Sequence, residues 1–421
     1  MQIKFTFDTN VSLDQRMGFE MAACIWSKLL KDDVTINLRI GATDQLGENG
    51  QAVGGAIPIF HETHYGIYQQ YLEADATTAE DQEVIGALQV GNTVDVMVDG
   101  EVIDGNTELM LTRAQAKALG MEDALVLDNG NTWDRDVITN PDGLDGYILI
   151  NDSFDWHYDL TREAAAPEGT LDFLTMALHE IGHALGFVSG LDSLIETFTT
   201  HSGEERTEGI TSLDLMRHAD GDGIADLTFG DATYFSLDGG QTSLAEFEEG
   251  DEYQASHWQR YQAALGIMDP TLGYQERTDI SKLDLQALDA IGWDVDYGAL
   301  NGLNLDALYI QAQQSLAGTF GVDVEAIETA LTSGQDWQSL GYEAWFNAFE
   351  EQILAQGWGT WFQGFDNQIL EQGWGTWFAE FQSELLEQGW GTWFAEFQDE
   401  LLAQDWGTWF QDLGLEEPEL N

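Results

Sequence analysis

Alternating hydrophobic and polar positions mark several short segments of the chain, and hydrophobic positions with helical spacing mark others. The alternation predicts strands over residues 2–7, 34–40, 94–103 and 146–151. The helical spacing predicts helices over residues 12–31, 170–187 and 281–291, and a mostly helical stretch over 60–90. Strands and helices in this order indicate an α/β (α+β) fold with a mixed, twisted sheet over residues 1–296.

The ends of two predicted helices carry the residues that such ends prefer. Gly186 stands where the helix over 170–187 should stop, and glycine readily takes the backbone conformation of a helix C-terminus. Ser281 precedes the helix over 281–291, with Asp284 three residues on, which is the spacing of a capping box. Between these helices, residues 188–256 are rich in Gly and Asp and predict irregular structure.

The C-terminal part of the chain has a different pattern. Residues 297–340 predict a helical linker, and residues 341–421 repeat with Trp358, Trp374, Trp390 and Trp406 spaced by 16. Each unit predicts a helix of about 12 residues, which is too short to be stable alone. Stacked units could share an aromatic core, so we expect a structural role, self-association or partner binding for the repeats.

Composition narrows the classes of function. The chain has 76 Asp and Glu against 14 Lys and Arg, a formal net charge of −62, which argues against binding to nucleic acid. No apolar run approaches the roughly 18 residues of a membrane span. The start, MQIKFTFDTN, does not resemble a signal peptide. We expect an extracellular location reached without that signal, with the cytoplasm as the alternative.

The residues with the clearest chemical meaning are His179, Glu180 and His183, in the sequence HEIGH on the helix over 170–187. Two histidines four positions apart project from one face of a helix, so both can bind one zinc ion. The glutamate beside them can act as the general base that takes a proton from water. This pattern predicts a zinc-dependent hydrolase.

A zinc centre of this kind needs a third protein ligand. In a common compact form of the motif the ligand follows six residues after the second histidine, but that position is Ser189. The remaining downstream histidines are His201, His218 and His257, and Asp192 could instead complete a site with two histidines. His61, His64 and His157 are more simply interpreted as ordinary polar residues.

Two further segments give the motif a family resemblance. ASHWQ (255–259) and GIMDP (266–270) resemble the metzincin zinc metallopeptidases of the leishmanolysin-like branch. Segments 211–217, 234–240 and 284–294 are also similar to a bacterial group of secreted metallopeptidase-like proteins. The resemblance implies a metzincin-like catalytic domain over 1–296, with His257 as third zinc ligand, Met268 in the turn below the metal, and strand 146–151 as the sheet edge that pairs with a peptide substrate.

Two weaker features complete the set of candidate sites. Asp220, Asp222 and Asp226 partly resemble a calcium loop, although the segment lacks the other ligands of such a loop and an acidic surface turn is the simpler interpretation. Tyr274 follows Met268 and could stabilise an oxyanion, but its spacing differs from that in metzincins.

The sequence therefore predicts a zinc metalloendopeptidase acting on protein or peptide substrates. The alternative is a non-catalytic extracellular binding or assembly protein that keeps a metzincin-like scaffold and uses the Trp repeats.

Overall fold

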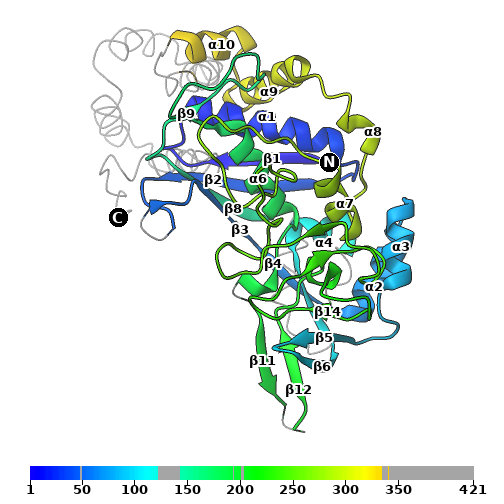
Figure 1. Ribbon diagram of the computed structural model, residues 1–421. Coiled ribbons are helices and arrows are strands. Elements are labelled where there is room, and N and C mark those ends of the chain that lie inside the picture. Colours follow the sequence, from blue (N-terminus) through cyan, green and yellow to red (C-terminus); the bar gives the residue numbers. More distant parts are fainter. Residues whose placement is uncertain (48–49, 122–142, 193, 201–202, 334–339, 341–421) are drawn as a thin grey trace, which may run out of the picture. The chain divides into compact units, whose positions relative to one another are not determined.

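The computed structural model describes residues 1–47, 50–121, 143–192, 194–200, 203–333 and 340 (Figure 1). Its contacts divide the chain into two units, Met1–Gln313 and Gln314–Asn421. The Trp repeats expected over 341–421 lie outside the described residues. Of the second unit the structure describes the end of α9 (Leu305–Phe320) and α10 (Val324–Ser333).

A four-stranded mixed sheet is the main sheet of the first unit. Its order is β1-β2-β8-β3, and the strands are β1 (Gln2–Phe7), β2 (Thr35–Thr43), β8 (Gly146–Asn151) and β3 (Gly54–Pro58). β1, β2 and β8 are parallel, and β3 runs antiparallel to β8. The predicted mixed α/β fold is thus confirmed, as are the strands expected over 2–7, 34–40 and 146–151.

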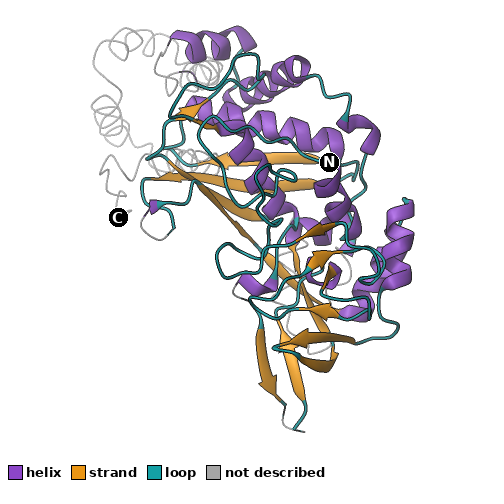
Figure 2. Cartoon of the chain, in the orientation of Figure 1, coloured by secondary structure: helices purple, strands orange, loops and turns teal. Residues whose placement is uncertain are grey.

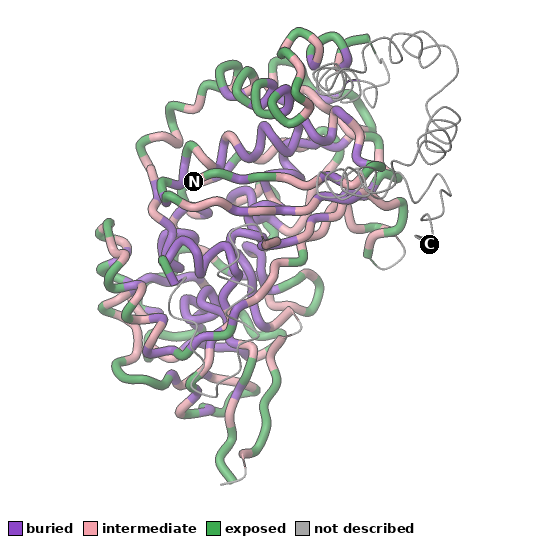
Figure 3. Tube along the Cα trace, turned by 180° about the vertical axis from the view of Figure 1, so that it is seen from behind, coloured by how far each residue is buried: buried purple, intermediate pink, exposed green. Residues whose placement is uncertain are grey.

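Two helices, α1 (Leu13–Leu29) and α6 (Phe173–Leu185), pack against each other and against this sheet. A row of aromatic rings joins the three elements, because Phe19 lies 5.7 Å from Phe5 of β1 and 5.8 Å from Phe173 of α6. The helices approach closely at Gly18, where an added Cβ would lie 2.3 Å from the ring of Phe173. The purple segments of Figure 3 trace this buried core.

Both ends of α6 lie at residue types that commonly begin or end a helix. Asp172 caps the N-terminus by accepting a hydrogen bond from the backbone N–H of Thr175 at 3.0 Å. Gly186 follows the last turn with φ of 126°, a conformation that other residues adopt only with strain. The helix expected over 170–187 is therefore confirmed, with an end at the expected glycine.

Shorter elements surround this layer. The helices are α2 (Tyr65–Asp75), α3 (Ala79–Ala87), α4 (Arg113–Ala118), α7 (Lys282–Ala290) and α8 (Tyr297–Leu300). The capping box predicted for α7 is present, because Ser281 and Asp284 exchange hydrogen bonds with each other's backbone N–H. β4 (Phe60–His64) pairs with β7 (Glu108–Thr112), and β9 (Trp156–His157) pairs with β10 (Leu171–Asp172).

The region between α6 and α7 is mostly loop with short strands, as its Gly and Asp content predicts (Figure 2). One sheet contains β13 (Arg217–His218), β15 (Tyr234–Phe235) and β16 (Ala245–Glu246), and another joins β14 (Ala225–Asp226) to β5 (Val94–Val98) and β6 (Glu101–Asn106). β11 (Glu196–Thr199) and β12 (Glu205–Glu208) form a hairpin whose first strand is exposed throughout.

Three expectations need correction. Segment 60–90 begins with strand β4, and segment 94–103 belongs to two strands, because Asp99 and Gly100 adopt φ of 51° and 77° and reverse the chain between β5 and β6. Strand 146–151 is not the sheet edge. It is the interior strand β8, and the edge is β3, whose sequence GGAIP lacks the alternation by which strands are recognised.

A search of the described helices for one that could cross a bilayer, judged by length and apolar character, finds none.

Candidate metal centre

The last turns of α6 bring His179 and His183 to one side of the helix. Their Nε2 atoms lie 3.1 Å apart, as expected for two histidines at a spacing of four. His183 is 8% exposed, so this face of α6 is almost closed to solvent except toward the cleft described below.

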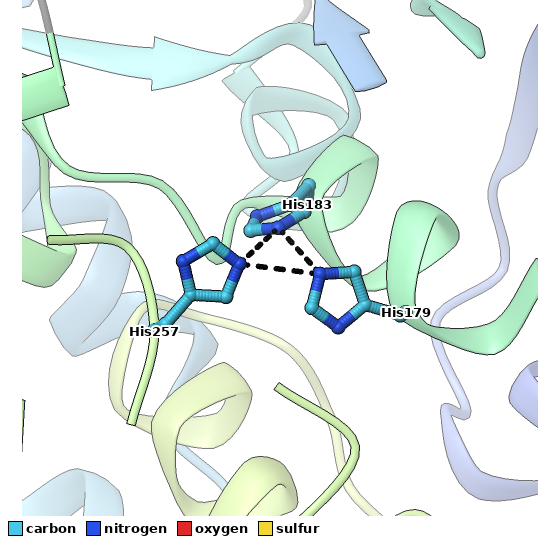
Figure 4. Close-up of side chains that lie close together, drawn as sticks. All are labelled: His179, His183 and His257. Atoms are coloured by element: carbon cyan, nitrogen blue, oxygen red, sulfur yellow. Dashed lines mark hydrogen bonds between the residues drawn. The ribbon is translucent and has the colours of Figure 1, made fainter. Parts of the chain in front are cut away.

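His257 completes the group from a loop that is far away in the sequence. Its Nε2 lies 3.2 Å from the Nε2 of His183 and 3.2 Å from that of His179 (Figure 4). Within the described residues these three are the one group of metal-ligating side chains whose ligand atoms lie close enough to share an ion. The structure therefore brings together the two histidines of the HEIGH motif and the third histidine that the family resemblance implies.

The other ring nitrogen of each histidine contacts a backbone carbonyl. Nδ1 of His179 lies 2.8 Å from the oxygen of Ile267, Nδ1 of His183 lies 2.7 Å from that of Phe187, and Nδ1 of His257 lies 3.0 Å from that of Gln254. These partners assign the proton to Nδ1, which leaves a lone pair on every Nε2. Three lone pairs that face one another are mutually repulsive, and a shared cation would remove this repulsion.

Burial keeps the three rings neutral. Burial, and then the neighbouring histidine, lowers the pKa of His179, His183 and His257 to about 3, so all three are unprotonated at neutral pH. Two Zn–N bonds of about 2.0–2.1 Å can join nitrogens up to roughly 4 Å apart, which includes all three measured separations. The donor set thus fits a zinc ion with three protein ligands.

Glu180 lies beside the histidines and is itself 5% exposed. Burial raises its pKa to about 8. The side chain packs against the backbone of β3, because a Cβ added to Gly54 would lie 2.6 Å from Oε1 of Glu180. The carboxyl group is therefore held between the face of α6 that carries the histidines and the edge strand of the sheet.

A cleft of about 800 Å³ runs along this edge strand and over the histidines. Residues 54–58 of β3 line one side, and segments around Ser256 and Pro270 line the other. Among its described lining residues are three carboxylates, Glu180, Asp192 and Asp269, and no Lys or Arg. The cleft thus joins the candidate metal centre to an open strand edge.

Met268 packs against the helix that carries His179 and His183. It is 1% exposed and packs against α6 between the two histidines, since a Cβ added to Gly182 would lie 2.5 Å from its sulfur. A glycine at this position of the helix allows the close approach of the methionine. The segment that carries Met268 also supplies the carbonyl of Ile267 that binds His179.

The described alternative third ligands do not join the group of close ligand atoms, although Asp192 lines the same cleft. Asp192 uses both carboxylate oxygens to accept backbone N–H groups, and Nδ1 of His218 contacts the carbonyl of Ile224 at 3.1 Å in the region between α6 and α7. His201 is outside the described residues.

His61 is buried on β4, and burial lowers its pKa to about 4. His64 is exposed at the start of α2, and His157 is half-buried on β9.

The two weaker predictions are not brought to the centre. Asp220 accepts the N–H of Asp222, and Asp222 and Asp226 each accept an N–H two residues on, so each carboxylate closes its own turn. They do not form a close group of ligand atoms in the described part of the chain. Tyr274 is 61% exposed and is not among the described residues that line the cleft.

Three buried polar residues support the site without having been singled out for that role. Asp284 accepts hydrogen bonds from Trp258 and Ile267, and Asp214 accepts one from Ser189 just after α6. Arg217 donates to the carbonyl oxygens of Glu248 and Ala255. Asp214 and Arg217 lie within the segment 211–217 that carries part of the resemblance, but their partners are distant in sequence and could not be deduced from it.

Comparisons with protein families, with curated proteins and with solved structures find no match to this chain. The argument for function therefore rests on the geometry of the site and on the sequence motifs.

Proposed function

We propose that this chain is a zinc-dependent endopeptidase with a metzincin-like catalytic domain. The observation that carries the proposal is the group of three neutral histidines, with Nε2 atoms 3.1–3.2 Å apart, beside a buried glutamate in an open cleft. A catalytic zinc site has three protein ligands and an open position, and a structural site is closed by four.

In this proposal His179, His183 and His257 hold the zinc ion. Bound zinc acts as a Lewis acid that polarises the scissile carbonyl and lowers the pKa of water. The carbonyl partners of the Nδ1 atoms fix the orientation of each ring and keep the lone pair on Nε2 directed at the centre.

Glu180 is the general base and later the general acid. It takes a proton from the attacking water and gives it to the leaving amine. Burial raises the pKa of its carboxyl group to about 8, and the positive charge of a bound zinc ion would favour the ionised form that accepts the proton.

The edge strand β3 binds the substrate as an extended chain. Within the described residues it pairs on one side only, with β8, and its other side borders the cleft. A peptide that adds to this edge would form backbone hydrogen bonds largely independent of its sequence. Ile57, which is 59% exposed, offers the added chain a hydrophobic contact.

The test is digestion of unfolded casein in a high-salt buffer that screens the acidic surface. We expect cleavage by the protein as purified with zinc, loss of cleavage after removal of the metal with a chelator, and recovery on addition of zinc. Cleavage that is unchanged in the metal-free protein would refute the proposal. Bound zinc without cleavage of any unfolded substrate would favour the non-catalytic alternative.

A further inference from the structure

His257 is held by an irregular loop, and the residues on both sides of it bind carboxylates: that of Asp192, which is half-buried, and that of Asp284, which is buried. On the N-terminal side, Oδ1 of Asp192 accepts the backbone N–H of Ala255 at 2.5 Å, and Oδ2 accepts that of Ser256 at 3.0 Å. Asp192 belongs to the 3₁₀ turn Gly190–Asp192, which follows α6 directly. This carboxylate therefore ties the third ligand's loop to the end of the helix that carries the other two.

On the C-terminal side the carboxylate is that of Asp284, which is fully buried in the first turn of α7. Its Oδ1 accepts the indole N–H of Trp258 at 2.8 Å, and its Oδ2 accepts the backbone N–H of Ile267 at 2.8 Å. The carbonyl of Ile267 in turn contacts Nδ1 of His179. One side chain thus connects the neighbour of His257 to the partner of His179.

Neither carboxylate belongs to the group of ligand atoms that could share an ion, although Asp192 lines the cleft. Their oxygens are taken up by N–H groups, so their effect on the centre passes through the backbone and Trp258. Hydrogen bonds from N–H to a carboxylate are shorter and stronger than neutral ones. These bonds add to the backbone hydrogen bonds that join His257 to Glu248 and Trp258 to Met268.

We propose that Asp192 and Asp284 are positioning residues that hold His257 at the spacing that a metal ion requires. The inference rests on the metal centre of the proposed function and extends it, because it assigns a role to two carboxylates that are not ligands. Metal affinity should depend on them more strongly than the stability of the metal-free fold does.

The test compares Asp192→Asn and Asp284→Asn with a matched control, Asp81→Asn. Asp81 is also a buried carboxylate that accepts two backbone N–H groups, those of Thr77 and Thr78, but it caps α3 away from the histidines. Zinc affinity is measured by competition with a chromogenic chelator, and the stability of each metal-free protein by thermal unfolding. Visible absorption after cobalt loading reports the ligand geometry.

We expect zinc affinity to fall about tenfold or more in Asp192→Asn and Asp284→Asn, with an altered cobalt spectrum, while Asp81→Asn keeps wild-type values for both. If all three variants lose stability alike and keep zinc affinity and spectrum, the carboxylates are only structural and the inference is wrong. If Asp284→Asn does not fold, Asp192→Asn decides the question alone. Failure of the wild-type protein itself to bind zinc would instead refute the proposed function.

Discussion

The two parts of the candidate metal centre are built in different ways. His179 and His183 are held by one regular helix, so their spacing follows from backbone hydrogen bonds within α6. His257 comes from a loop 74 residues after His183 and is placed by polar side chains from several elements. The positions of His179 and His183 follow from a local sequence pattern. The position of His257 depends on the folded state of the whole domain.

The comparison teaches that a loop can position a ligand as closely as a helix does when polar side chains bind its backbone and its neighbours. All three Nε2 separations agree within 0.1 Å, at 3.1, 3.2 and 3.2 Å. Anchors of this kind are costly to disturb, because a buried polar group that loses its partner is not compensated by water. The loop half of the site should therefore be the more sensitive half to changes outside the ligands.

The largest effects are expected for the ligands themselves. His183→Ala and His257→Ala should each lose stoichiometric zinc and all detectable casein cleavage, because neither leaves three nitrogens at the centre. Zinc content after dialysis and cleavage of casein measure the two effects. Retention of zinc by His257→Ala alone would show that the loop ligand is dispensable and that the two halves of the site are unequal.

The next largest effect is expected for Arg217, which is 2% exposed and lies under the loop. Its guanidinium donates to Oγ1 of Thr233 at 2.6 Å, to the carbonyl of Glu248 at 3.1 Å and to that of Ala255. Arg217→Met leaves these buried acceptors unpaired and should lower the free energy of unfolding by about 3 kcal/mol.

Urea unfolding of the metal-free protein measures this change. Lys282→Met serves as the control, because the Lys282 side chain is 60% exposed and its ion pair with Glu80 should contribute less than about 1 kcal/mol. Equal effects of the two substitutions would contradict the importance given to buried anchors.

A smaller effect, on turnover alone, is expected at the contact between the edge strand and Glu180, the proposed general base. Gly54→Ala places a Cβ 2.6 Å from Oε1 of Glu180 and must displace that side chain. Displacement of a catalytic group by about 1 Å can cost roughly a hundredfold in rate. We expect kcat for a peptide substrate to fall by about ten- to a hundredfold with zinc content unchanged, and Gly55→Ala, on the same strand, to be much less affected.

Asp32, Asp75 and Asp289 differ from the carboxylates that anchor the loop, because they lie near other carboxylates and one oxygen of Asp289 accepts no hydrogen bond. Asp289 is fully buried and its Oδ1 accepts no hydrogen bond from any described residue. Burial, and then nearby carboxylates such as Asp294 and Asp81, raises the pKa of Asp32 to about 6 and of Asp75 and Asp289 to about 7.

These pKa values lie above those of the unfolded chain, which are about 4. At these three carboxylates the folded protein therefore binds more protons than the unfolded chain between about pH 4 and pH 7, so their contribution to stability falls as pH rises through that window. The buried histidines, whose pKa is lowered, act in the opposite direction below about pH 6.5. We therefore expect the Tm of Asp289→Asn, relative to that of the wild-type protein, to rise by roughly 5 °C from pH 5 to pH 8 in low salt. A difference in Tm between the two proteins that does not change over this range would contradict this explanation.

Much of the fold and half of the site could be predicted from the sequence, for reasons visible in particular residues. The strand QIKFTF and the helix around HEIGH have clear periodicity, and Asp284 and Gly186 mark helix ends by local rules. The Gly-rich edge strand β3 could not be recognised, because strand patterns depend on side chains that it lacks.

The part of the site that depends on long-range contacts, the loop with His257, could be predicted from the sequence only in part. His257 could be selected from its neighbours Ser256 and Trp258 through the family resemblance, but its anchors could not. The bonds from Asp192 to Ala255, and from Asp284 to Trp258, join residues that are separated by 63 and 26 positions. No local pattern encodes such a pairing, since it arises only when tertiary packing excludes water from both groups.

The most direct test of the proposed peptidase is a paired measurement on Glu180→Gln and the wild-type protein. Zinc content and casein cleavage are determined on the same folded samples. We predict one zinc per chain in both proteins and a loss of cleavage of about a hundredfold or more in the variant, because glutamine cannot accept the proton. Cleavage by the variant at the wild-type rate, or a folded wild-type protein that binds no zinc, would contradict the account.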